Sequence, residues 1–158
     1  KMLKKQLIIF KIVLIYFLNP TFSHADLVKP NSGIKPNQVI KMQLKSLKYN
    51  DRPSMDNGIN QVWEFAHPNN KKNTGPLTKF SKMIKGKSYK VLLNHLDHKI
   101  IQLKLTKSIA LYEVIILDEK KLYFKLNWQV EKYTKDGPLK NCWLTVMVSD
   151  PILLGSSI

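Results

Sequence analysis

Residues 58–80, GINQVWEFAHPNNKKNTGPLTKF, decide how the rest of the chain is interpreted. Four apolar residues recur at offsets 0, 3, 4 and 7: Ile59, Val62, Trp63 and Ala66. This spacing predicts one buried face of a helix, with Trp63 at its centre and Phe65 directed elsewhere. The helix is expected to stop before Pro68, where a polar loop with room for one helical turn begins. A further helix is expected to open at Pro76.

The segment before this stretch predicts another amphipathic helix. In residues 37–50, NQVIKMQLKSLKYN, three apolar residues lie at offsets 0, 4 and 7: Ile40, Leu44 and Leu47. Pro36 suits the first helical position, and Pro53 limits how far the helix can run. The sequence therefore predicts helices first, with a last short helical turn at residues 87–93.

From residue 94 onward the apolar pattern changes to alternation, which is typical of strands. Strands are predicted at residues 95–105, 108–117, 122–132 and 142–148. The charged residues 118–121 form a hairpin turn, and residues 133–141 form a longer connection. Helices followed by antiparallel strands predict an α+β fold, in which N-terminal helices pack on a curved antiparallel sheet of about four strands.

The chain of 158 residues has the length of one domain. Residues 1–25 have the pattern of a signal peptide: basic residues at the start, the apolar run LIIFKIVLIYFL at 7–18, and Ser23-His24-Ala25 before Asp26. Residues 26–35 are then a polar leader, 36–150 the single domain and 151–158 a tail. The protein is expected to be exported to the periplasm or another extracytoplasmic space, or else anchored in a membrane by an uncleaved signal.

The charge balance is strongly basic, with 26 Lys and Arg against 11 Asp and Glu. Removing the four lysines of residues 1–25 leaves 22 against 11, or +11. Only Arg52 is an arginine, and specific nucleic-acid recognition favours arginine, so a nucleic-acid partner is not expected. A weak association with an anionic surface remains open if the lysines gather on one face. The single cysteine, Cys142, excludes an internal disulfide framework.

The order of the elements resembles the nuclear-transport-factor-2-like, or SnoaL-like, cone fold. Four phrases are more narrowly similar to the domain-of-unknown-function family 4864: VIKMQLKSLKYND, GINQVWEFAHPNNKKNTGPLTKF, LLNH and NCWLT. The resemblance covers residues 36–148 and implies a pocket between helices and sheet. It implies no established activity, substrate or catalytic residues. The small hairpin usual between the second and third helices of the wider fold is replaced here by residues 68–75, so pocket positions do not transfer from its enzymes.

Few residues point to chemistry. His95 and His98 are three apart, and on a strand such residues face opposite sides, so no metal site is expected there. His67 is expected to end a helix, and Cys142 is expected to be a buried structural thiol. No nucleophile elbow, phosphate loop or zinc motif is present, and no cofactor is expected.

An aromatic set is expected first of all in the core, with a second role as the lining of an apolar pocket: Trp63, Tyr89, Trp128 and Trp143. The predicted pocket residues are Trp63, Tyr89, Asn94, His95 and Trp143, with Asn94 and His95 as the polar pair at its mouth.

Two function classes remain open. The first is a non-catalytic module that binds a small apolar ligand or an envelope protein. The second is a small isomerase- or hydrolase-like enzyme that uses Asp97, Glu113 or His95 as an acid or base. An ionisable side chain inside a closed cavity would favour the enzyme, and an apolar cavity would favour the binder.

Overall fold

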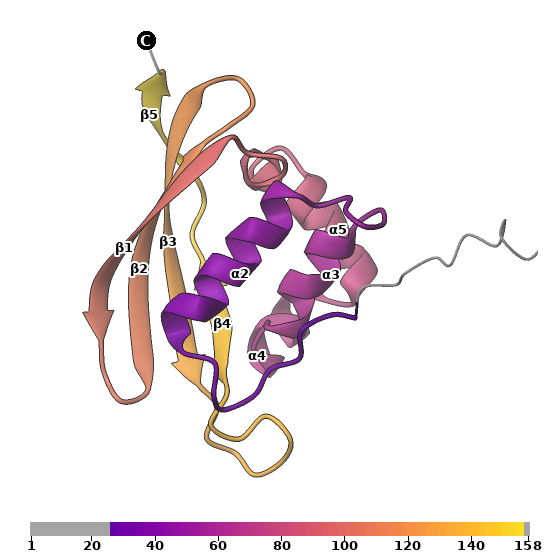
Figure 1. Cartoon of the computed structure of the whole chain (residues 1–158), viewed down its shortest axis with the longest axis vertical. Helices are drawn as coiled ribbons and strands as arrows, with labels where there is room; N and C mark the ends of the chain where they lie inside the picture. The colour runs from indigo at the N-terminus through magenta and orange to yellow at the C-terminus, as the bar shows by residue number, and fades with distance from the viewer. Residues whose placement is uncertain (1–25, 157–158) are drawn as a thin grey trace, which may run out of the picture.

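The computed structural model describes residues 26–156 (Figure 1). The predicted signal peptide lies outside the described residues. The helices are α2 (Pro36–Lys48), α3 (Asn57–Glu64), α4 (Pro68–Thr74), α5 (Leu77–Lys85) and the 3-10 helix η1 (Tyr89–Leu92). The strands are β1 (Asp97–Leu105), β2 (Ile109–Leu117), β3 (Leu122–Lys132), β4 (Trp143–Val148) and β5 (Ile152–Ser156). No helix in residues 26–156 combines the length and the apolar character needed to span a membrane.

The strands form one antiparallel sheet in the order β1-β2-β3-β4. β3 is the longest strand and shares its second edge between two partners. β4 pairs with residues 128–132 of β3, and β5 pairs with residues 122–125. The pairing of β3 with β4 shifts at Val146, which therefore bulges from the ladder. This bulge lies beside the cavity described below.

The helices cover one face of the sheet, and Figure 1 shows α2 between the sheet and the other helices. Alternate residues of β2 point into this layer and are fully buried: Ala110, Tyr112, Val114 and Ile116. They meet the apolar stripe of α2, formed by Ile40, Leu44 and Leu47, as its spacing predicts. The predicted α+β fold, helices on a curved antiparallel sheet, is confirmed.

A close approach of two helices requires glycine at residue 58. The backbone N–H of Gly58 donates to the carbonyl of Asn50 over 2.8 Å, and the Asn50 side chain accepts from the N–H of Ile59 over 3.0 Å. A methyl group on Gly58 would collide with the backbone carbonyl of Ser46 in α2. Asn50 thus anchors the start of α3, and Gly58 lets α3 lie against α2.

The roles of Trp63 and Phe65 are the reverse of those predicted. Phe65, which was expected to point away from the core, is fully buried in it. Trp63 is only half-buried and stacks on Phe80 with ring centroids 5.0 Å apart. The reason is that α3 ends at Glu64, so the backbone turns and Phe65 no longer follows the helical spacing.

The two terminal segments are more ordered than the sequence suggests. In the leader, Val28 exchanges two backbone hydrogen bonds with the Gln61 side chain, over 2.8 and 2.9 Å, and Lys29 pairs with Glu64. After Pro151 the sequence predicts a tail, but residues 152–156 form β5 on the free edge of β3. An unpaired strand edge offers backbone partners that a short local pattern does not reveal.

Candidate ligand-binding cavity

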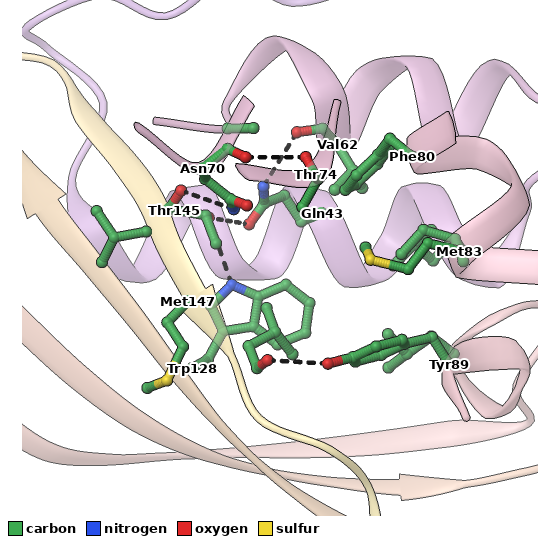
Figure 2. Close-up of a pocket in the computed structure, with 16 residues that line it drawn as sticks. Gln43, Val62, Asn70, Thr74, Phe80, Met83, Tyr89, Trp128, Thr145 and Met147 are labelled. Carbon is green, nitrogen blue, oxygen red and sulfur yellow. Dashed lines mark hydrogen bonds between the residues drawn. The ribbon is translucent and has the colours of Figure 1, made fainter. Parts of the chain in front are cut away.

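A cavity of about 170 Å³ lies between the helices and the β4 side of the sheet (Figure 2). Its floor consists of buried side chains from α2, η1, β3 and β4: Gln43, Leu47, Leu92, Trp128 and Thr145. Its mouth consists of partly exposed side chains from α4, α5, η1 and β4: Asn70, Thr74, Met83, Tyr89 and Met147. The register of β3 and β4 shifts at Val146, which lies in the lining of this space.

The polar groups of the floor bond with one another. The indole N–H of Trp128 donates to Thr145 Oγ1 over 3.4 Å, and the Thr145 hydroxyl donates to Gln43 Oε1 over 2.7 Å. The Gln43 amide in turn donates to the carbonyl of Val62 over 3.4 Å. Figure 2 shows this chain running from β3 across β4 to α2 and α3. A buried network of this kind fixes side-chain positions, and no buried side-chain N or O atom in the described residues lacks a partner.

The mouth is held by bonds to the backbone of β4. Asn70 Nδ2 donates to the carbonyl of Thr145 over 3.3 Å, and the Tyr89 hydroxyl donates to the carbonyl of Val148 over 3.2 Å. Burial raises the pKa of Tyr89, and the nearby Asp150 carboxylate raises it further. Tyr89 is therefore a neutral hydrogen-bond donor at neutral pH.

The lining is poor in ionisable groups. Among the residues that the structure describes, Tyr89 is the only side chain lining this cavity that can gain or lose a proton. The acid and base candidates lie elsewhere. Glu113 is on the helix-free face of the sheet within 3.7 Å of Lys125, and Asp97 is exposed at the start of β1.

Of the predicted pocket residues, the structure brings only Tyr89 to the cavity. Trp63 packs outside it against Phe80, and Trp143 lies in the core under the Lys132 ammonium, 5.3 Å from its ring. Asn94 and His95 line a separate shallow hollow together with Lys48, Tyr49 and Arg52. The predicted polar pair is therefore not at the mouth.

The sequence did not point to Gln43 or Thr145, and Trp128 was expected only as a member of the aromatic set that could line a pocket. One signal was available for Gln43, because it falls next to the apolar stripe of α2 where a buried polar side chain needs a partner. Nothing local identifies that partner, since Thr145 is 102 residues away.

His95 and His98 do not face opposite sides, as was predicted for residues three apart on a strand. β1 begins only at Asp97, and Asn94 has a φ of 54°, so His95 precedes the strand and does not follow its alternation. The two rings meet, with His95 Nε2 at 2.8 Å from His98 Nδ1. In residues 26–156, however, no group of three or more His, Cys, Asp and Glu side chains is placed to hold a metal ion.

His67 and Cys142 have structural roles and do not line the cavity. His67 does not end a helix as predicted, because α3 stops at Glu64; it caps the start of α4, where its ring nitrogen Nδ1 accepts from the backbone N–H of Asn69 over 3.1 Å. Cys142 is buried, and burial raises the pKa of its thiol, which lowers the fraction of reactive thiolate.

Comparisons of the chain with protein-family models, curated proteins and solved structures found no match.

Proposed function

We propose that this domain is a non-catalytic binding module that takes up a small apolar molecule in the cavity between α4, α5, η1 and β4. The observation that carries the proposal is the lining: apolar side chains surround the space, and Tyr89 is its only ionisable group among the described residues. Burial of apolar surface supplies affinity in such a site, and a few polar groups set the orientation. An acid–base catalyst needs a titrating group near neutrality, and a tyrosine with a raised pKa does not provide one.

The size of the cavity limits the ligand. An apolar cavity of about 150 Å³ in another protein accommodates benzene. The 170 Å³ here therefore suits one ring or a chain of about six carbons. Each methylene that enters is expected to contribute about 0.8 kcal/mol, so affinity should rise with chain length until the space is filled.

The three tryptophans provide a site-specific test by ¹H–¹⁵N NMR. Trp128 lines the cavity, whereas Trp63 and Trp143 do not, so only one of the three indole N–H signals should respond to a ligand inside. Titration with 1-butanol, 1-pentanol and 1-hexanol is expected to shift the Trp128 signal, with about fourfold tighter binding per added carbon. A shift of all three signals, or of none, would contradict the proposal.

A matched pair of variants distinguishes binding inside the cavity from binding elsewhere on the protein surface. Met83→Trp places a large side chain at the mouth and is expected to abolish the response of Trp128. Met55→Trp makes the same change at a position that is 79 % exposed and distant from the lining, so it should leave binding intact. If both variants bind 1-hexanol like the wild type, the ligand does not occupy this cavity.

The wider proposal is an exported module of the cell envelope. Its support is the pattern of residues 1–25 and the resemblance of the helix and strand phrases to family 4864 within the nuclear-transport-factor-2-like fold. The enzymatic alternative would be favoured by turnover of an ester or ketosteroid-type substrate that is lost in Glu113→Gln or His95→Ala.

A further inference from the structure

The floor of the cavity has no need of a polar ligand atom. Trp128, Thr145 and Gln43 already bond with one another and with the carbonyl of Val62. An apolar group that packs on them leaves these bonds intact, whereas a polar atom placed there would have to compete with them. The deep part of the site therefore suits the apolar end of a ligand, and any polar end belongs at the mouth.

The elements that form the mouth carry lysines and no carboxylates. From residue 65 to residue 96 the chain has no Asp or Glu, yet it contains seven lysines: Lys71, Lys72, Lys79, Lys82, Lys85, Lys87 and Lys90. This segment includes α4, α5 and η1, which together with β4 supply the mouth residues. Among the ion pairs of residues 26–156, only Lys85 of this set takes part, with Asp56.

Two of these lysines lie close to mouth residues along α5 and η1, although neither lines the cavity itself. Lys79 lies one helical turn before Met83 on α5, so the two side chains share a face. The Lys79 side chain also lies over Gly75, the residue that follows Thr74. Lys90 follows Tyr89 in η1 and is exposed.

Two other charged residues lie near the elements of the mouth, Lys71 and Asp150. Lys71 lies over the Trp63 ring, 5.2 Å from its centroid, on the outer side of α3. Asp150 is the carboxylate near Tyr89, at the β4 end of the opening. The elements around the opening therefore carry lysines on α5 and η1 and one carboxylate, Asp150, near Tyr89.

We propose that the ligand is a small monocarboxylate whose apolar tail fills the cavity and whose carboxylate stays at the mouth beside Lys79 and Lys90. This inference rests on the proposed function, because it names the chemical class of the molecule that the cavity binds. The lysines attract the anion and orient it, while the tail supplies most of the affinity.

Three ligands with the same five-carbon tail test the inference: hexanoate, 1-pentanol and pentylammonium. Binding is followed by the Trp128 indole signal at about 20 mM salt, where exposed charges interact over long range. Hexanoate is expected to bind about two- to fivefold more tightly than 1-pentanol, the scale of an exposed ion pair, and pentylammonium more weakly than both. At about 1 M salt the Debye length falls to ~3 Å, and the preference should disappear.

Charge-neutralising variants locate the carboxylate. Lys79→Gln and Lys90→Gln are each expected to weaken hexanoate about two- to fivefold and to leave 1-pentanol unchanged. Lys104→Gln is the matched control, since Lys104 is an exposed lysine of β1, at the opposite end of the strand order from β4. Asp150→Asn should strengthen hexanoate binding, because it removes the one carboxylate near Tyr89.

The outcomes separate this inference from the proposed function. If 1-pentanol or pentylammonium binds as tightly as hexanoate, the carboxylate preference is wrong and the apolar cavity remains a binding site. If Lys104→Gln weakens hexanoate binding as much as Lys79→Gln does, the anion is attracted by the overall positive charge of the protein. The placement of the carboxylate at the mouth is then wrong. If none of the three ligands shifts Trp128, the proposed function falls together with the inference.

Discussion

The Nε2 atom of His95 lies 2.8 Å from the Nδ1 atom of His98, and this contact determines how both rings are protonated. His95 Nδ1 lies 2.7 Å from the carbonyl oxygen of Leu92, which can only accept, so Nδ1 carries the proton. The neutral His95 ring then accepts at Nε2, and His98 donates from Nδ1. His95 is 1 % exposed, and burial is the main reason that its pKa falls to about 4.

This pair predicts a loss of stability in mild acid. The unfolded chain binds a proton at His95 near pH 6.5, whereas the folded chain binds it only near pH 4. Stability is therefore complete above pH 6.5 and decreases as the pH falls toward 4, by about 3 kcal/mol in total from His95. The charged neighbours do not reverse the sign, because Lys48 and His98 also lower this pKa and only Asp97 opposes them among nearby side chains.

Urea unfolding at pH 7.5 and pH 4.5 measures the effect. His95→Asn removes the titrating group and should reduce the difference between the two pH values, even if it lowers stability at both. Equal differences in wild type and variant would show that His95 is not held neutral.

The buried chain through Thr145 predicts an energetic coupling. Thr145→Val leaves Gln43 Oε1 without its donor and Trp128 Nε1 without its acceptor, and this is expected to cost about 2–3 kcal/mol. Gln43→Met should then cost less in the Thr145→Val background than in wild type, because the unpaired oxygen is gone. Chemical unfolding of the four proteins gives the coupling, and Thr78→Val, an exposed threonine of α5, is the matched control. Additive effects at the two sites would contradict the hydrogen bond.

The reversed positions of Phe65 and Trp63 predict unequal costs of truncation. Phe65→Ala removes a fully buried ring and should cost about 3–5 kcal/mol. Trp63→Ala removes a half-buried ring that stacks on Phe80, and about 1–2 kcal/mol is expected. Thermal melts of both variants decide the order, and a larger loss in Trp63→Ala would support the arrangement predicted from the helical spacing.

The proposed export predicts a defined N-terminus for the mature protein. Cleavage after Ala25 would leave Asp26 as the first residue. Mass spectrometry of protein from the native envelope fraction is expected to find that terminus. An intact residue 1–25 segment recovered with membranes would instead favour the uncleaved anchor.

The order of helices and strands was accessible from the sequence because periodicity is a local property. The alternation in residues 122–132 predicts β3 to the residue, and the stripe of Ile40, Leu44 and Leu47 predicts the buried face of α2. Local patterns fail where an element ends. Phe65 lies just beyond the end of α3, so the helical spacing does not predict its direction. His95 lies just before the start of β1, so the alternation of the strand does not apply to it.

The sequence by itself determined the fold class and the basic segment of residues 65–96, because both follow from residue types and their order along the chain. Only the tertiary structure decided which side chains form the cavity. Gln43 and Thr145 meet across 102 residues, and the space beside them is also lined by residues of α4 and α5. A cavity is what the packing of distant elements leaves unfilled, and no single segment encodes it.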